Sequence, residues 1–431
     1  MGHDCKFRHG SRLADGPAHG HDHSLWSRRA FLGSMGLATG ALAVGGIPMR
    51  AFGQPSMLSS LAGVDSDRVL VILQLAGGND GLNTVVPFRN DTYFSSRPKL
   101  AITDSLPISD ELGFHPAFGR LAETFAEGEL AIVHSVGYEE SKLSHFSGTD
   151  IWMTAGDSGS IPEDGWAGRF LDVARGDNLH PYPMAIQLGD GAPLLFQGPS
   201  SQMGMSIQSM ALFERLATTG QLYDTSRLPS NELGQVVSFM RAVSNNLIFY
   251  ADSVKTAYAA GSNQTTYPGN NLLADQLAAI ARLIRGGLGT RIYHVTVNGF
   301  DTHAKQADTH AQLLQQVSGA MGSFFEDLGQ DDTDQRVLGM TFSEFGRRVK
   351  ENASAGTDHG TSAPLFLFGP AVAGGFHGTA PDLSDTDEGG NLRFETDYRS
   401  VYGTVLQRWF GLSGAETTNI LGADFGVLDV L

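Results

Sequence analysis

Short apolar runs alternate along this chain with stretches in which apolar residues recur every three or four positions. The runs are typical of strands buried on both faces of a sheet, and the second spacing is typical of helices with one buried face. Strands are predicted at 68–75, 130–136, 184–188, 291–297, 336–341 and 364–368. Helices are predicted at 116–127, 144–154, 166–174, 304–328, 344–351 and 398–410. This alternation predicts the α/β class, with a mostly parallel sheet and helices on both faces.

The pattern changes between residues 191 and 288. Short strand-like pieces give way there to long helical stretches at 232–259 and 271–285. We therefore expect one α/β domain over residues 65–431, and we expect it to contain a helical insertion, or cap, at 191–288.

The N-terminal region has the pattern of an export signal. Arg28 and Arg29 stand shortly before an apolar run, 33–47, which five glycines make only weakly hydrophobic. An arginine pair before such a run is typical of twin-arginine signals, and the run is too weakly apolar for a membrane span. Residues 1–53 are thus predicted to be a leader that is removed when the twin-arginine translocase exports the protein, which becomes periplasmic or secreted.

The amino-acid composition excludes several classes of function for the mature chain. Its sole cysteine, Cys5, lies in the leader, so the mature chain is expected to lack disulfides, a thiol nucleophile and cysteine metal ligands. Residues 1–53 hold six of the 29 Lys and Arg residues and three of the 46 Asp and Glu residues, so 23 basic residues remain against 43 acidic ones. Such an acidic surface repels nucleic acid and anionic lipid. No later apolar run is long enough for a membrane span, so we expect no nucleic-acid or membrane partner.

Two segments place an aspartate close to a histidine. Asp301 and His303 belong to the segment GFDTH, and Asp358 and His359 belong to GTDHG. Both segments are predicted to lie on loops at strand ends, where the ligands of parallel sheets bind. Carboxylate oxygen and neutral imidazole suit a divalent cation such as Zn²⁺, so we predict a site for one or two ions. The alternative is that both aspartates cap the following segments and both histidines bond to loop backbone.

Two further residues are candidate metal ligands. Asp80 lies in the glycine-rich loop after the first predicted strand, and His377 lies in the segment GGFHG. Glycines let the backbone approach a ligand closely, which favours a binding loop. The alternatives are a polar cap of a tight turn for Asp80 and an ordinary loop histidine for His377.

Four residues are candidates for catalysis. Ser144 and His145 open a predicted helix, where the hydroxyl is well placed as a nucleophile and the histidine as a metal ligand or an acid. Ser144 suits the role of a helix cap equally well. Glu344 is predicted to enter the site and Arg347 to grip an anionic substrate, with a solvated helix face as the alternative for the arginine.

These motifs resemble those of the bacterial exported family called domain of unknown function 1501. The resemblance rests on the leader and on the segments GGNDGLNTVVP (77–87), SHF (144–146), GFDTH (299–303), TFSEFGRR (341–348) and GTDHG (356–360). That family is similar to the alkaline-phosphatase-like superfamily, which includes alkaline phosphatases and sulfatases. The resemblance implies a metal site with Asp80, Asp301, His303, Asp358, His359 and His377 as ligands, and Ser144 or Ser147 as the nucleophile.

The function expected from these features is a metal-dependent hydrolase of phosphate or sulfate esters, acting on a small anionic substrate after export. Bound cations would supply the local positive charge that an acidic protein needs to hold an anionic ester. The chain lacks the Cys-x-Pro-x-Arg segment of ordinary sulfatases, which weighs against that class. The alternative is a non-catalytic exported protein that keeps the same fold.

Overall fold

The computed structural model describes residues 67–431, apart from 177–179, 190, 192, 200, 212, 214–223 and 225–231, together with two short strands, β1 (Ala43–Val44) and β2 (Ile47–Pro48). The predicted twin-arginine motif and the predicted cleavage region lie outside the described residues. Within the described part of the chain, no helix combines the length and the apolar character that crossing a bilayer requires.

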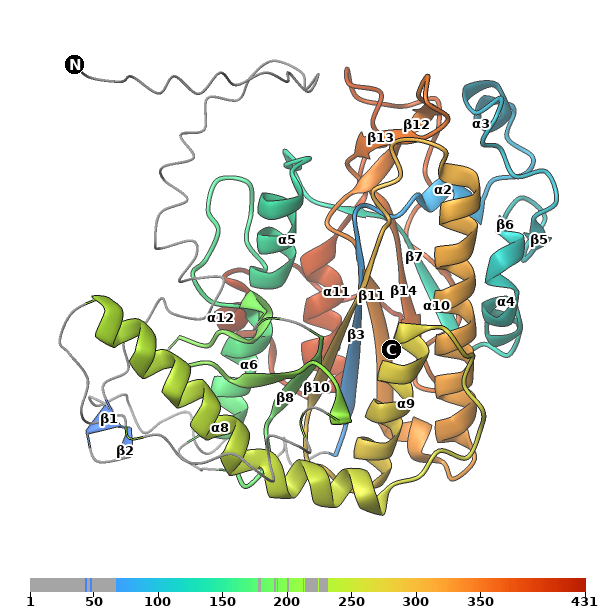
Figure 1. The fold of residues 1–431 in the computed structure, drawn as a ribbon. Helices are drawn as coiled ribbons and strands as arrows, with labels where there is room; N and C mark the ends of the chain where they lie inside the picture. Colours follow the sequence, from blue (N-terminus) through green and yellow to red (C-terminus); the bar gives the residue numbers. More distant parts are fainter. Residues whose placement is uncertain are drawn as a thin grey trace, which may run out of the picture.

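A nine-stranded sheet forms the centre of the molecule, in the order β15-β7-β14-β11-β3-β10-β8-β9, with β16 paired to β7 (Figure 1). Its strands are β3 (Val69–Ala76), β7 (Leu130–Gly137), β8 (Ala185–Leu188), β9 (Gly204–Ile207), β10 (Ile292–Asn298), β11 (Val337–Phe342), β14 (Ala363–Phe368), β15 (Gly375–His377) and β16 (Thr396–Asp397). Both partners of β14 run antiparallel to it, and the other pairs are parallel. The predicted fold class is therefore confirmed.

Helices cover both faces of this sheet. Successive residues of β3 alternate between two cores: Val71 and Leu73 pack in the first, and Leu70 and Ile72 in the second. The first core contains α4 (Gly119–Ala126), α9 (Leu272–Arg285) and α10 (Gln306–Gly329), and the second contains α5 (His145–Thr154), α6 (Trp166–Arg175), α11 (Tyr398–Thr404) and α12 (Gly414–Leu421). Burial on both faces explains why β3 is a continuous apolar run.

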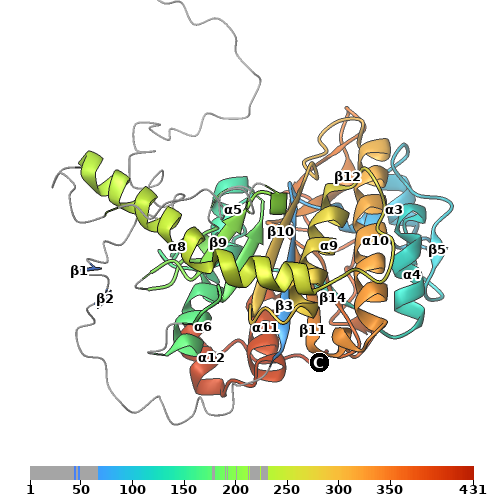
Figure 2. The same ribbon diagram turned by 60° about the horizontal axis from the view of Figure 1, so that its bottom comes forward.

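The segment 191–288 contributes to the sheet and to the core. β9 extends the sheet beyond β8, and Leu277, Ile280 and Ile284 of α9 belong to the same core as β3. The long helix α8 (Glu232–Ala260) packs against α9 and β9 and runs across the side of the molecule that Figure 2 brings forward. The part predicted as a helical insertion thus supplies an edge strand and a core helix as well as α8.

The helix predicted over 344–351 is wrong, because these residues form β12 (Gly346–Glu351), which pairs antiparallel with β13 (Thr357–Gly360). Burial alternates along β12: Arg347 and Val349 are buried, and the residues after each of them are more exposed. Phe345 and Val349 lie four residues apart, which over so short a window suits a helix as well as a strand. The same hairpin places Asp358 and His359 in a strand and not on the predicted loop.

Smaller elements lie outside the main sheet. They are α2 (Gly81–Thr84), β4 (Val85–Val86), α3 (Asp91–Ser96), β5 (Leu106–Pro107), β6 (Gly113–Phe114), and the 3₁₀ helices η3 (Pro116–Phe118), η4 (Leu194–Phe196) and η5 (Thr333–Arg336). A π-helical turn, η6 (Val405–Trp409), follows α11. β3 and β10 end in step, since Ala76 pairs with Asn298, so the loops that follow them meet.

Candidate metal centre

The loops after β3 and β10 are in direct backbone contact. Gly77 has φ +122°, and a Cβ added there would lie 2.2 Å from the backbone nitrogen of Asp301. Phe300 also donates its N–H to the carbonyl of Ala76, at 3.1 Å. A residue with a side chain would force these loops apart, so Gly77 fixes where Asp301 stands relative to the sheet.

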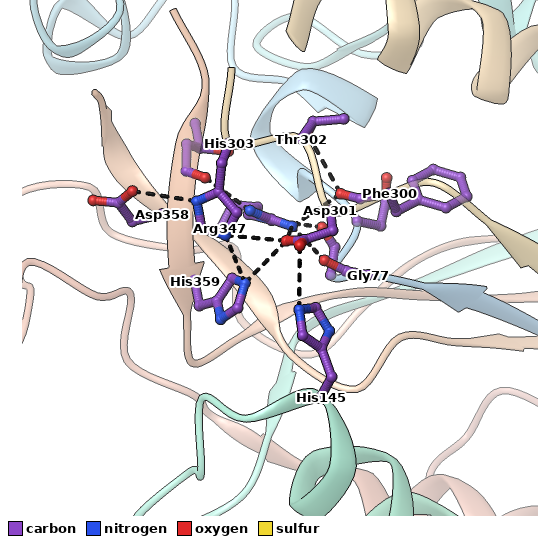
Figure 3. Close-up of polar contacts among 12 residues, drawn as sticks. Gly77, His145, Phe300, Asp301, Thr302, His303, Arg347, Asp358 and His359 are labelled. Atoms are coloured by element: carbon purple, nitrogen blue, oxygen red, sulfur yellow. Dashed lines mark hydrogen bonds and ion pairs between the residues drawn. The ribbon is translucent and has the colours of Figure 1, made fainter. Parts of the chain in front are cut away.

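Three imidazoles surround the carboxylate of Asp301 (Figure 3). Its Oδ1 lies 3.0 Å from Nε2 of His303 and 3.0 Å from Nε2 of His359, and these two nitrogens are 2.9 Å apart. Its Oδ2 lies 3.3 Å from Nε2 of His145. The histidines come from the start of α5, the loop after β10 and the strand β13, so the fold assembles them from distant parts of the chain. We call these four residues the Asp301 cluster.

The other nitrogen of each imidazole faces an acceptor. Nδ1 of His359 lies 2.9 Å from the carbonyl oxygen of Leu143, and Nδ1 of His145 lies 2.9 Å from Oε1 of Glu344. Nδ1 of His303 lies 3.5 Å from Oδ1 of Asp358. A ring nitrogen that faces such an acceptor carries the proton, so in the neutral ring the lone pair is on Nε2.

Three Nε2 lone pairs therefore converge on one carboxylate. Metal-binding histidines have this arrangement, in which the distal N–H is donated to a carbonyl or carboxylate that fixes the tautomer and the ring orientation. The ligand atoms of His145, Asp301 and His359 all lie within 4.8 Å of one another. Three imidazoles and a carboxylate suit Zn²⁺ and related divalent cations. The residues of the cluster thus fit a divalent cation.

The guanidinium of Arg347 holds Asp301 in position and still leaves lone pairs of its carboxylate for a cation. Nη2 of Arg347 donates to Oδ1 of Asp301 at 2.8 Å, and a carboxylate oxygen has a second lone pair for a cation. Burial alone would raise the pKa of Asp301, but the hydrogen bond and the positive charge of Arg347 lower it below its usual value. Asp301 is consequently ionised at neutral pH and available as an anionic ligand.

The histidines of the cluster differ in their environments. The hydrogen bond to Glu344 raises the pKa of His145, whereas burial lowers the pKa of His359. The ring of Phe345 packs against His359, with centroids 4.1 Å apart, and so limits its rotation. His359 is therefore held neutral and in place, as a nitrogen ligand must be.

Glu344, predicted to enter the site, and Arg347, predicted to grip an anionic substrate, are both buried, each 2% exposed. Oε1 of Glu344 accepts from the backbone N–H of Gly77 at 2.8 Å and contacts His145, so it links the ring to the β3 loop. Arg347 donates to the carbonyls of Gly78, Thr357 and Phe300 at 2.7, 2.7 and 2.9 Å. The guanidinium is committed to backbone behind Asp301 and does not face solvent.

Two predicted metal ligands lie apart from the cluster. Asp80 is buried, with Oδ2 2.6 Å from Nη1 of Arg97 and a further hydrogen bond from Gln306. His377 lies in β15 at the sheet edge, and its Nε2 contacts the carbonyl of Ala373. Four strand spacings separate β15 from β3, roughly 19 Å at about 4.8 Å each, which is too far for one shared ion. The structure thus brings together His145, Asp301, His303 and His359, with Asp358 behind His303.

The two candidate hydroxyls lie beside the cluster. Ser144 is exposed at the N-cap of α5, directly before His145, and its side chain makes no capping hydrogen bond. Ser147 is in the first turn of the same helix and is half-buried. The N-terminus of a helix favours anions, so an anionic group near Ser144 would also meet the backbone N–H groups of α5.

Some residues that shape the site left no recognisable signal in the sequence. Leu143 contributes through its backbone carbonyl, for which any residue would serve. Asn352 donates from Nδ2 to Oδ1 of Asp358 at 3.2 Å and so supports the carboxylate behind His303. Arg97 neutralises Asp80 from 17 residues away, a separation that matches no known motif. Pairing of this kind becomes visible only when the chain is folded.

Comparison with solved structures gives low overall similarities. The lipoteichoic acid synthase LtaP from Listeria monocytogenes has 9% identity and a TM-score of 0.36, covering 85% of this chain and 76% of that one. A protein of the alkaline phosphatase superfamily from Vibrio parahaemolyticus has 10% identity and a TM-score of 0.38, covering 83% and 69%. The PsFucS1 sulfatase from Pseudoalteromonas sp. has 11% identity and a TM-score of 0.37, covering 88% and 75%. Likenesses this weak carry no weight for function.

Sequence comparison finds a family that matches part of the chain. A search of the curated proteins finds no match to this chain. Residues 220–422, by contrast, match the family described as Protein of unknown function (DUF1501). The matched part contains Asp301, His303, Asp358 and His359, and the segment 341–348. The resemblance to the domain of unknown function 1501 family, predicted from the motifs, is therefore confirmed over residues 220–422.

Proposed function

We propose that this protein is an exported hydrolase of phosphate or sulfate esters that works with one divalent cation held by His145, Asp301, His303 and His359. The observation that carries the proposal is the convergence of three imidazole Nε2 atoms on the Asp301 carboxylate, each with its Nδ1 on an acceptor. Zn²⁺ is the cation that this ligand set favours.

The cation would act as a Lewis acid on an ester oxygen and offset the negative charge of the substrate. The protein's own side chains hold the site in shape: Glu344 orients His145, Asp358 orients His303, and Arg347 anchors Asp301. Ser144, exposed beside His145, is our candidate nucleophile, and Ser147 is the alternative. Ligands that are already in position do not have to reorganise during the reaction, and this preorganisation lowers the activation free energy.

Export is the second part of the proposal. The arginine pair and the weakly apolar run after it favour passage through the twin-arginine translocase to the periplasm or beyond. This route carries folded proteins, so metal could be inserted before transport. Expression in a host that lacks this translocase should leave the leader uncleaved, whereas a host that has it should release a shortened chain.

Metal content tests the site. The full chain, expressed without a histidine tag in an export-competent bacterium, should contain a single equivalent of a divalent metal. Asp301→Ala and His359→Ala should lose it, and His377→Ala, which removes a histidine at the far sheet edge, should keep it. Metal in none of the proteins, all of them folded, would overturn the proposal and leave the non-catalytic alternative.

Hydrolysis tests the chemistry. The metal-loaded protein should cleave members of a panel of phosphate and sulfate esters, and chelation should stop the reaction. Loss of a nucleophile lowers kcat by at least about 100-fold, so Ser144→Ala should do so and Ser147→Ala should not. A metal-loaded protein that cleaves no ester would contradict the enzyme and favour a binding role for the same centre.

A further inference from the structure

A cleft of about 430 Å³ opens beside the Asp301 cluster. His145 and Asp301, both of the cluster, line it together with Phe146, Asp150 and Glu344. Its size falls within the range of small-molecule sites, about 300–1,000 Å³. An ester whose charged group sits at the cluster would extend its alcohol portion into this cleft.

The lining of the cleft is acidic. Asp150, Asp301 and Glu344 supply three carboxyl groups, and the lining contains neither lysine nor arginine. An alcohol portion that carried a negative charge would be repelled there. Arg347 already offsets the charge of Asp301. A neutral alcohol portion would still leave Asp150 and the second oxygen of Glu344 without a partner, so the cleft favours a cation.

Two of these carboxyl groups lack a partner for a charged oxygen. Glu344 is 2% exposed, and its Oε2, the oxygen that contacts neither Gly77 nor His145, has no hydrogen-bond partner. The carboxyl of Asp150 forms no hydrogen bond or ion pair with the described residues, and burial raises its pKa to about 6. A buried carboxyl without a donor is costly, and a ligand with N–H groups or a positive charge would remove that cost.

An aromatic ring completes the lining. Phe146, in the first turn of α5, is 73% exposed and lines the cleft beside Asp150 and His145. Aromatic faces attract ammonium groups, and quaternary ammonium ligands are commonly held by rings together with carboxylates. Phe146 and Asp150 of α5, together with Glu344 from the segment between β11 and β12, thus form a lining suited to an ammonium group.

We propose that the cleft binds an ammonium group on the alcohol portion of the ester, with Asp150 and Glu344 as its counter-charges. The substrate class is then an amino-alcohol or choline-type ester of phosphate or sulfate. This inference rests on the proposed function for the position of the ester group, while the ammonium site stands on the cleft itself.

Two pairs of substrates with the same shape test the inference. Choline phosphate is compared with 3,3-dimethylbutyl phosphate, and choline sulfate with 3,3-dimethylbutyl sulfate, because each pair differs by one positive charge. The full, metal-loaded protein should favour the choline ester by roughly tenfold in kcat/KM, as expected of a partly desolvated cationic contact. Asp150→Asn should reduce this ratio toward one, and Asp252→Asn, an exposed aspartate on α8, should preserve it.

Binding separates this inference from the proposed function. Calorimetric titration with choline should show binding to the wild-type protein. The Asp150→Asn variant should bind choline more weakly, and the neutral alcohol 3,3-dimethylbutanol should not bind. If no ester is cleaved but choline binds in this way, the hydrolase fails and the ammonium site stands. Equal kcat/KM for both members of each pair, or no preference for choline over the neutral alcohol, would overturn the ammonium site.

A second arm identifies the source of the ammonium group. Phosphatidylcholine vesicles present the same headgroup on a lipid, as a phosphodiester. Choline release from the soluble monoester alone would assign a free metabolite, and release from the vesicles would assign a lipid headgroup.

Discussion

The carboxylates of Asp80 and Asp301 follow adjacent strands of the sheet, β3 and β10, but their surroundings differ. Asp80 is buried and meets Arg97 at 2.6 Å, and Gln306 donates to it from the start of α10. Asp301 is exposed to solvent and meets three imidazoles, with Arg347 behind it. Asp80 is surrounded by hydrogen-bond donors of the protein itself. The three imidazoles near Asp301 instead present nitrogen lone pairs, which a cation would bind.

The difference shows what separates a structural carboxylate from a ligand. Asp80, Arg97, Gln306, Asn79 and His310 form a buried group that we call the Asp80 network. In this network Nε2 of His310 donates to Oδ1 of Asn79 at 2.9 Å, which leaves the lone pair of the neutral ring on Nδ1, an atom without a hydrogen-bond partner among the described residues. Proximity of Asp and His is common to both sites, and the orientation of the imidazole decides which one can hold a cation.

Asp80→Asn should have the largest effect among the changes that test this comparison. The substitution leaves the buried Arg97 without its counter-charge, and breaking such a pair costs about 3–5 kcal/mol of unfolding free energy. Chemical denaturation of the full chain would measure the loss. Metal content should stay at the wild-type value, because Asp80 contacts no residue of the Asp301 cluster.

The control for this prediction is an aspartate in an exposed ion pair. Asp385 lies 2.8 Å from Arg393, both side chains being exposed, so Asp385→Asn should change the unfolding free energy by less than about 1 kcal/mol. An Asp80→Asn protein that keeps its stability and loses its metal would make Asp80 a ligand and remove the distinction between the two sites.

Much of the fold could be predicted from sequence because its strands are buried on both faces. The predicted strand at 68–75 differs from β3 by one residue at each end, and the one at 291–297 likewise from β10. The hairpin of β12 and β13 was not predicted, because it forms a separate sheet outside the central one. In β12 a buried position is occupied by Arg347, so its sequence lacks the apolar run of a central strand. Local periodicity identifies central strands better than peripheral ones.

The candidate site was harder to predict, because distances across a sheet depend on strand order. Asp301 and His303 share one loop, so their proximity follows from sequence alone. His377 lies close to neither, since β15 pairs with β7 at the sheet edge, and nothing in the segment GGFHG indicates that partner. Asp80 was predicted as a ligand because it lies in a glycine-rich loop after a strand. Its pairing with Arg97 could not be predicted, because α2 and α3 separate the two residues in the chain.

The pH dependence of stability should distinguish the two sites next. Burial lowers the pKa of His310 from 6.5 to about 4, so the folded protein excludes a proton that the unfolded chain binds below about pH 6.5. Stability should therefore fall as the pH drops from 6.5 to 4, by up to about 3 kcal/mol from this residue. His310→Gln should flatten that slope, as measured by denaturation at a series of pH values.

Gln330→Asn serves as the control, because Gln330 is exposed at the C-cap of α10 and the substitution removes no titratable group. The change of its unfolding free energy with pH should equal that of the wild type. If His310→Gln also left the pH dependence of stability unchanged, burial would not be what keeps His310 neutral. Water would then reach the Asp80 network more easily than its burial indicates.

The smallest effect is expected at Asp358, which the structure places behind His303 and not among the atoms that converge on Asp301. Asp358→Asn keeps the shape of the side chain and removes the charge that faces Nδ1 of His303 at 3.5 Å. Loss of such a supporting carboxylate lowers metal affinity by about tenfold to 100-fold, and the long contact here favours the lower value. Competition with a metal-binding dye would measure it, against Asp385→Asn as the control. Complete loss of metal, equal to that expected for Asp301→Ala, would instead make Asp358 a direct ligand and require the hairpin to close further over the cation.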